Sequence, residues 1–309
     1  MAHLQFALIC LMFGSNFMLM DRTLSVLGPG TVAVGRLLGG AALLLVVWWF
    51  SGQRLRLTYR QWIVLVLVSL LANSFPFLMQ PWLMAQGADH SFLAMFVPLT
   101  PLMTILASVP LLGIRPNWQQ LVGVMGGLVL VVWMAADGAQ HGVAWPLMPV
   151  VVAIPLLYAV GNTYLRRDLH EVPAVPLTTL LLAIAGVSLL PWAVRELADS
   201  FPRASAAEWG WITLYLILLG PLGSGLCIVM LVKLVQDRGP LFAGMVTYVV
   251  PVVALFWGWQ TSEAITMVQI IAMTGILAMV ALVQSSTLPP TVATPQEEAA
   301  FAQPPLGGE

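Results

Sequence analysis

Residues 83–101 read LMAQGADHSFLAMFVPLTP, and they align without a gap with residues 233–251, which read KLVQDRGPLFAGMVTYVVP. The alignment, at a shift of 150 residues, pairs these identical residues: Gln86 with Gln236, Phe92 with Phe242, Met95 with Met245 and Pro101 with Pro251. Shifts of 147 to 150 residues pair further identities upstream: Ser74 with Ser224, Gly14 with Gly161, Pro29 with Pro176 and Gly39 with Gly186. Because the matches keep one order over both halves of the chain, we interpret them as an internal repeat.

Composition places both copies of this repeat in a lipid bilayer. Hydrophobic residues make up 60% of the 309 residues and charged residues only 8%, whereas a soluble domain carries about 25% charged residues. A membrane span needs roughly 20 mostly apolar residues, so the chain has room for about ten spans. The net charge of -1 gives no basic surface for nucleic acid. We therefore expect an all-α membrane protein with no soluble domain and no nucleic-acid partner.

Apolar runs between charged, proline-rich or glycine-rich breaks predict ten transmembrane helices. They lie near residues 3–20, 31–50, 61–82, 91–112, 117–136, 144–165, 174–194, 209–232, 240–260 and 264–284. The first run has no basic residue before it, so we interpret it as a retained span and not as a signal peptide. All twelve tryptophans fall at or near predicted helix ends, and tryptophan prefers the membrane–water interface.

The distribution of Lys and Arg predicts the orientation, because cytoplasmic loops carry the excess. With the N-terminus inside, eight of the twelve lie on the inner side: Arg54, Arg56, Arg60, Arg115, Arg166, Arg167, Lys233 and Arg238. The outer side then holds Arg22, Arg195 and Arg203, and Arg36 lies within the second span. We therefore expect both termini in the cytoplasm and a multi-pass protein of the inner (plasma) membrane.

A repeat unit of five spans has a consequence for its orientation. Because five is odd, the second copy must enter the membrane in the sense opposite to the first, which makes an inverted-topology repeat. We expect the first repeat in residues 1–137 and the second in residues 138–286. Residues 287–309 are rich in Pro and Ala and acidic, which predicts a disordered C-terminal tail.

Several short motifs add to this organisation. The first span contains Gly14-Ser15-Asn16-Phe17, and the second has Gly28-Pro29 followed by Arg36-Leu37-Leu38. Pro101 and Pro251 lie in the fourth and ninth spans, Glu263 follows the ninth, and Gly275 lies in the tenth. Over about residues 5 to 285 the chain thus resembles the EamA-type permeases of the drug/metabolite transporter (DMT) superfamily. It departs from the family at Gly113-Ile114-Arg115, where members often have an acidic residue.

The resemblance implies a permease of ten helices that exports or imports small solutes. Substrates in the family include amino acids and their derivatives, purines, other metabolites and drugs, so the resemblance leaves the substrate open. It also implies a central cavity lined by the first, third, fourth, sixth, eighth and ninth helices.

Polar residues inside spans are costly in lipid unless they have partners, so they are candidates to line that substrate-binding cavity. The candidates, with the aromatic Trp82, are Ser15, Asn16, Asn73, Ser74, Gln80, Trp82, Thr100, Thr104, Tyr158, Asn162, Ser224, Thr247 and Tyr248. The alternative role of each is a hydrogen bond between helices. Arg36 is a candidate gate or contact to an anionic group, or else an arginine that reaches the outer interface. Pro101 and Pro251 are candidate hinges, because proline inside a helix bends it.

The chain shows no pattern for metal or cofactor chemistry. No His and Glu set has metal-ligand spacing, and no glycine-rich loop follows a strand. Cys10 and Cys227 both lie in apolar runs, where they serve as small hydrophobic residues. No Asp or Glu lies deep in a predicted span, so facilitated exchange or uniport is as open as proton coupling.

These features predict a secondary transporter and not an enzyme. We expect an alternating-access permease, an exporter, for a small-molecule substrate such as an amino acid, a derivative of one, or an amphipathic compound. A membrane assembly subunit without transport of its own, and an intramembrane enzyme, are the alternatives. Monomer and homodimer are both left open.

Overall fold

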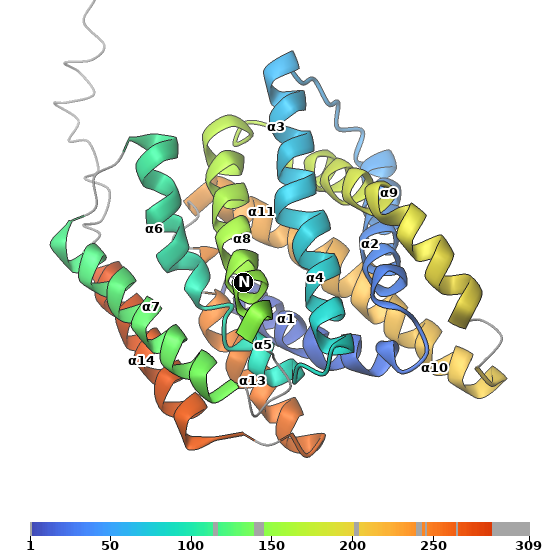
Figure 1. The fold of residues 1–309 in the computed structure, drawn as a ribbon. Helices are drawn as coiled ribbons and strands as arrows, with labels where there is room; N and C mark the ends of the chain where they lie inside the picture. The colour runs from blue at the N-terminus through green and yellow to red at the C-terminus, as the bar shows by residue number, and fades with distance from the viewer. Residues whose placement is uncertain are drawn as a thin grey trace, which may run out of the picture.

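A computed structural model describes residues 2–113, 117–138, 145–200, 204–238, 243–244, 246–263 and 265–285. Every regular element in these ranges is a helix (Figure 1), as composition predicts. Residues 287–309, for which we expect a disordered tail, lie outside the described residues.

The helices follow the predicted spans closely. In the first half they are α1 (Ala2–Leu24), α2 (Pro29–Ser51), α3 (Tyr59–Ser69), the π-helical segment η1 (Leu70–Ser74), α4 (Phe75–Ala85), α5 (His90–Ala94), α6 (Leu99–Leu112) and α7 (Trp118–Gly138). In the second half they are the short η2 (Trp145–Leu147), α8 (Met148–Asp168), α9 (Ala174–Ser200), α10 (Ala206–Ile217), the π-helical segment η4 (Leu218–Leu226), α11 (Cys227–Arg238), α13 (Val246–Gln260) and α14 (Met267–Ser285).

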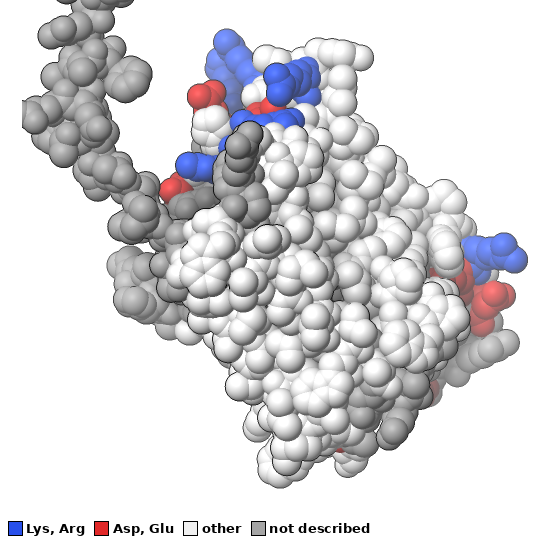
Figure 2. Space-filling view, turned by 60° about the vertical axis from the view of Figure 1, so that its left-hand side comes forward, with Lys and Arg blue, Asp and Glu red and all other residues white. Residues whose placement is uncertain are grey.

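Length and composition make this a multi-pass membrane protein. Six helical stretches are long and apolar enough to cross a membrane: Ala7–Leu24, Pro29–Ser51, Tyr59–Ala85, Trp145–Asp168, Ala174–Asp199 and Ala206–Asp237. Four further apolar helices are shorter: Leu99–Leu111, Trp118–Met134, Val246–Gln260 and Met267–Val283. On the face shown in Figure 2, charged side chains gather at two margins, and the broad surface between them is uncharged. Large apolar side chains such as Trp49, Phe50 and Val129 are exposed at the surface of the molecule, as expected for contact with lipid.

Helices from corresponding positions of the two halves pack against each other in pairs. α2 lies along α9, and α7 lies along α14 at one side of the molecule (Figure 1). Gly123, Gly126 and Leu130 of α7 face Val283, Met279 and Gly275 of α14 in that order, so the two helices run antiparallel. α1, the first helix of the first half, packs on α13 of the second half. Its counterpart α8, at the start of the second half, packs on α6 of the first half.

The N-termini of α7 and α14 repeat one capping arrangement. The backbone N–H of Asn117 donates to Gln120 Oε1 (3.0 Å), and that of Gln120 donates to Asn117 Oδ1 (2.8 Å). Thr266 and Gln269 exchange the same two bonds at 3.2 Å each. This is a capping box, in which two otherwise unpaired N–H groups of the first turn are satisfied reciprocally. The sequences here are also similar, Gln120-x-x-Gly123-x-x-Gly126 and Gln269-x-x-Ala272-x-x-Gly275, and they share this local structure.

Two π-helical segments also stand at corresponding positions. In η1 the Ser74 hydroxyl donates to the Ser69 carbonyl (3.1 Å), and in η4 the Ser224 hydroxyl donates to the Leu219 carbonyl (2.8 Å). A π-helical turn shifts the backbone ladder by one residue, and each serine satisfies a carbonyl five residues earlier. The paired serines of the sequence repeat thus maintain paired irregularities within two membrane helices.

The fourth predicted span, residues 91–112, is not one helix as expected. α5 ends at Ala94 and α6 begins at Leu99, and the backbone between them makes tight turns, with Val97 N–H bonded to the Ala94 carbonyl (3.1 Å). Pro98 lacks the N–H that a continuous helix would use at that point. The seventh span also differs, because α9 continues past the predicted end at residue 194 to Ser200.

Glycines allow α2 to approach η4 backbone to backbone. A Cβ built on Gly40 would lie 2.8 Å from Gly225 N and 3.1 Å from the Gly220 carbonyl oxygen. Backbone atoms cannot move aside as a side chain can, so only glycine fits without separating the helices.

We predict that Gly40→Ala destabilises the folded protein by about 1–3 kcal/mol, the range for overpacking a filled interior. Thermal unfolding of the purified protein in detergent measures the effect. The matched control is Gly210→Ala, because a Cβ at Gly210 meets nothing within 4 Å. Equal melting temperatures for the two variants would contradict the close approach of α2 and η4.

Candidate functional site

A cavity of about 1050 Å³, its open mouth included, lies between helices of both halves. The polar side chains that line it are Asn16, Arg36, Asn73, Gln80, Thr100, Tyr158, Asn162 and Thr247. Most of the remaining lining is apolar, and it includes the aromatic rings of Phe13, Phe17 and Phe77. An apolar lining with a few polar groups is typical of small-molecule sites. The cavity therefore suits a small solute with a substantial apolar part.

The broken fourth span forms one wall of this cavity. Val97, in the break, and Thr100, in the first turn of α6, both line it. The Thr100 hydroxyl donates to the Val97 carbonyl (2.8 Å) and so satisfies one carbonyl at the break. Irregular backbone at membrane depth is tolerated where it is buried in protein or lines a cavity, and interrupted helices are common at the binding sites of transporters.

Several lining side chains are tied to the backbone and hold helices together. Asn16 Nδ2 donates to the Gly223 carbonyl of η4 (3.1 Å), and Asn73 Nδ2 donates to the Val68 carbonyl (3.2 Å). The Thr247 hydroxyl donates to the Gly244 carbonyl (2.5 Å). Their donor groups serve the fold, and their oxygen acceptors remain for a solute.

Gln80, Tyr158 and Asn162 differ from that group. Within the described residues, no hydrogen bond occupies the side chains of these three. Gln80 comes from α4, and Tyr158 and Asn162 come from neighbouring turns of α8. They are the lining groups best placed to bond a solute.

Six of the expected site residues do not line the cavity. Their positions are as follows: Ser15 accepts from Trp257 Nε1, Ser74 bonds to Ser188, Thr104 donates to the Thr100 carbonyl, Ser224 donates to the Leu219 carbonyl, and Trp82 and Tyr248 pack against the apolar core. The bonds of Ser15 and Ser74 join different helices, as in the alternative role, whereas those of Thr104 and Ser224 lie within one helix.

Arg36 lines the same cavity although it is only 4% exposed. Its guanidinium lies over the Phe77 ring, 4.4 Å from the ring centroid, and contacts Met20 Sδ. Its Nε has no hydrogen-bond partner, and no salt bridge to Arg36 is found among the described residues. A buried charge without a counter-ion is costly, so its place at the cavity wall requires an explanation beyond packing.

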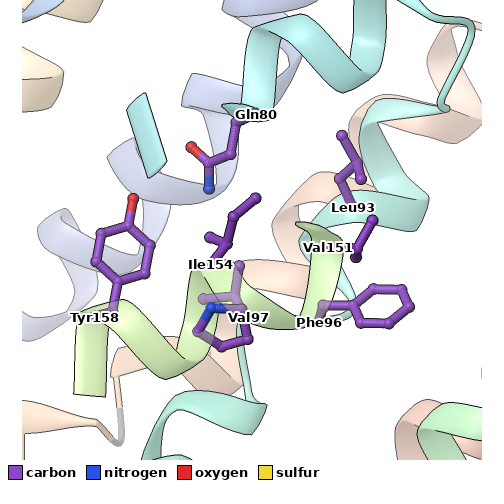
Figure 3. A pocket seen from close by; sticks show the side chains of 8 residues that line it. Gln80, Leu93, Phe96, Val97, Val151, Ile154 and Tyr158 are labelled. Carbon is purple, nitrogen blue, oxygen red and sulfur yellow. The ribbon is translucent and has the colours of Figure 1, made fainter. Parts of the chain in front are cut away.

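A second, smaller pocket of about 270 Å³ adjoins the first. Both are lined by Gln80, Val97 and Tyr158, and the smaller one continues towards Leu93 and Ile154. Figure 3 shows the Gln80 amide and the Tyr158 hydroxyl directed towards the same space. The two spaces therefore meet at these three shared residues.

The two candidate hinge prolines lie in different settings. Pro101 lies in the first turn of α6, directly after the break, where a missing N–H costs little. Pro251 lies inside α13, as a helix-bending proline would. Met245, the counterpart of Met95 in the sequence repeat, lies outside the described residues.

A carboxylate connects the loop after α13 to the start of α5. Glu263, in the loop after α13, accepts hydrogen bonds from the backbone N–H groups of His90 (2.9 Å) and Ser91 (3.2 Å) and from the Ser91 hydroxyl. His90 Nδ1 also lies 2.6 Å from Glu263 Oε1. We call these contacts of Glu263 with His90 and Ser91 the latch.

The latch depends on ionised Glu263. Burial raises the pKa of the Glu263 carboxyl, but the hydrogen bonds from His90 and Ser91 outweigh it and hold the pKa below its usual range. Because the pKa is lowered in the latched state, the stabilisation is present at neutral pH and is lost as the pH falls through that lowered pKa. Gly258 leaves room for the carboxylate, since a Cβ there would lie 2.7 Å from Glu263 Oε2.

The opposite end is held by bonds to backbone carbonyls. Arg167 Nη1 donates to the Leu111 carbonyl (2.9 Å), and Gln236 Nε2 donates to the Leu169 carbonyl (2.9 Å). Arg60 and Asp168 form a salt bridge at the surface (2.8 Å). Arg60 and Arg167, which the sequence places on the inner side, lie at this end.

Sequence reasoning missed the latch and part of the cavity wall. It used Glu263 as one of the residues that carry the family resemblance, predicted no contact for it, and assigned no role to His90, which lies 173 positions away. The pairing of an acid with backbone N–H groups leaves no pattern in the sequence. Leu181 of α9 and Ile228 of α11 also line the cavity, and nothing distinguishes them from other apolar residues of their helices.

Comparison with known proteins agrees with this architecture. The EamA-like transporter family matches residues 1–136 and 146–285. A solved crystal structure superimposes with a TM-score of 0.65 over 92% of this chain and 97% of its own, at 20% sequence identity, which shows a shared fold. Comparison with curated proteins gives no significant match. The resemblance stated from the sequence is thereby confirmed, and the chain belongs to the EamA-like transporter family.

Proposed function

We propose that this protein is an alternating-access permease for small metabolites. The cavity between the two halves carries the proposal, because free polar groups, a broken helix and an apolar lining meet in one place. Alternating access uses one central site that rocking of two halves exposes to either side of the membrane. Family membership supports transport over the two alternatives, an assembly subunit and an intramembrane enzyme.

The proposal includes ten spans arranged as inverted repeats in residues 1–137 and 138–286. It is supported by the antiparallel packing of corresponding helices. Gly126 faces Met279 and Gly275 faces Leu130, and a shift of 149 residues maps each pair onto the other. Such reciprocal contacts are what a two-fold relation between the halves produces. Both termini in the cytoplasm of a cell, and the inner (plasma) membrane as location, follow from the distribution of arginines.

We propose export as the direction. The cavity lining extends to Leu165, Leu231 and Gly244, and Leu165 and Leu231 lie near Arg166 in the last turn of α8 and Lys233 of α11. In the proposed orientation that end is cytoplasmic. The latch lies on the outer side in this orientation, and an opening at the cytoplasmic end would admit a solute from inside, which supports the proposal of export.

The cavity suits amino acids, their derivatives or other amphipathic compounds. Its lining is mostly apolar with a few polar groups, as in the sites of small molecules. Phe13, Phe17 and Phe77 offer apolar contact, and Gln80 and Asn162 offer an amide oxygen and amide N–H groups.

We predict that Asn162→Ala lowers transport by roughly tenfold with normal membrane abundance, because it removes one free polar contact, worth about 1–1.5 kcal/mol. Mass spectrometry of medium and cell extract, with the protein expressed or absent, measures flux over a panel of dipeptides and common metabolites. The contrasting variant is Ser15→Ala, which removes the acceptor of a hydrogen bond from Trp257 outside the cavity and should lower abundance and activity together.

Three results would count against this proposal. If Asn162→Ala loses abundance and activity equally, Asn162 is structural. If an inserted wild-type protein moves no compound of the panel, the assembly subunit is favoured. Conversion of a compound instead of its redistribution would favour an enzyme.

We predict that Glu263→Gln opens the latch, since the amide loses the charge and one acceptor oxygen. Hydrogen exchange of the backbone amides in residues 88–95 should become roughly tenfold faster, as expected for the loss of a charge-assisted bond worth about 1.5–3 kcal/mol. The control is Glu208→Gln, because Glu208 caps its own helix with Ser205. Unchanged exchange in residues 88–95 would show that the latch is not a closing contact.

A further inference from the structure

Arg36 is the one charged side chain in the described lining of the cavity. Its lining partners include neither Asp nor Glu, so nothing there neutralises the guanidinium. In the low-dielectric interior an unpaired charge is destabilising, and ionisable residues at membrane depth usually mark the path of a substrate or ion. The arginine is therefore a positive centre without its counter-ion.

Arg36 is held in a defined position inside the protein. The side chain is 4% exposed, and the Phe77 ring 4.4 Å from its guanidinium carbon restricts its position. Met20 Sδ contacts Nη1, and Nε remains without a partner. A guanidinium has five N–H donors in a planar fork that matches a carboxylate. Most of these donors are unused in the described structure.

An arginine that simply reached the interface would not have these properties. Snorkelling places the charged head in water and buries the stem, whereas here the head is buried and faces the cavity. Exposed Arg22, two positions after Met20, already provides a basic residue at that end of α1. The position of Arg36 is thus better explained by a ligand than by anchoring.

We propose that Arg36 binds the carboxylate, or a similar anionic group, of an amphipathic organic anion whose apolar body lies against the phenylalanines of the cavity. This inference rests on the proposed function and names its substrate class. A zwitterion is less well matched than an anion, because the described lining offers no carboxylate for an ammonium group. A cation is matched worst, since it meets Arg36 with like charge.

The test is a series of four probes with the same phenyl ring and chain: 3-phenylpropionate, 3-phenylpropanamide, phenylalanine and 3-phenylpropylamine. Binding to the purified full-length protein is measured by the ligand-dependent rise of the melting temperature. We expect 3-phenylpropionate to bind at least about tenfold more tightly than the neutral amide, since hydrogen bonds to charged partners exceed neutral ones. The amine should bind most weakly.

Arg36→Gln should reduce the affinity for 3-phenylpropionate to that for the amide and leave the affinity for the amide within about twofold. Arg36→Lys keeps the charge without the planar fork and should retain part of the preference. Arg22→Gln, at an exposed arginine outside the cavity, is the matched control and should change neither affinity. If Arg36→Gln does not fold, the wild-type series and Arg36→Lys decide.

Tighter binding of phenylalanine or the amine than of 3-phenylpropionate would overturn the inference. Retention of the anion preference in Arg36→Gln, or binding of no probe by the wild-type protein, would do the same. None of these results bears on transport itself, because the flux panel and Asn162→Ala test the permease independently.

Discussion

The structure depends on one constraint: in hydrocarbon, every backbone N–H and C=O group must find a partner within the protein. Regular helices meet it automatically, and this chain departs from them at η1, at η4 and between α5 and α6. At each departure a hydroxyl satisfies a carbonyl. Ser74 bonds to Ser69, Ser224 to Leu219 and Thr100 to Val97. Irregular backbone is therefore confined to places where short polar side chains or a cavity accommodate it.

The same constraint divides the polar side chains of the spans into two groups. The side-chain amides of Asn16 and Asn73 donate hydrogen bonds to backbone carbonyls, and the Ser15 hydroxyl accepts one from Trp257. Gln80 and Asn162 face the cavity without such bonds. The first group holds the helices in position, and the second group is left for a solute. A variant of the first group therefore changes stability and activity together, whereas one of the second changes activity alone.

Much of the fold could be predicted from the sequence, because periodic signals determine it. Apolar runs located the helices, and the pairs Ser74 with Ser224 and Gln120 with Gln269 proved to occupy matching π-helical segments and capping boxes. The end of α9 could not be predicted. The span predicted to end at residue 194 stops before charged Arg195 and Glu196, yet α9 continues to Ser200 and the Glu196 carboxylate accepts from Thr31 N–H at the start of α2 (2.9 Å).

The site was less predictable, because a sequence shows which residues are polar and not which partners they find. Ser74 and Asn162 look equivalent as polar residues in apolar spans, but Ser188 occupies the hydroxyl of Ser74. The latch could not be predicted from the sequence for a related reason. It joins Glu263 to backbone groups, and those groups carry no residue-specific signal.

The repeat makes the two halves similar, and the latch makes them different. A shift of 150 residues places Gly113 where the second half has Glu263, so one copy has a carboxylate and the other has no side chain. A carrier that alternates needs two states that differ by only a few kcal/mol, and similar halves bring the two states close in free energy. The bonds of Glu263 to His90 and Ser91 join the loop after α13 to α5 only at this end. In the proposed mechanism, near-symmetry would supply the alternation, and this one unmatched carboxylate would favour the state closed at its own end.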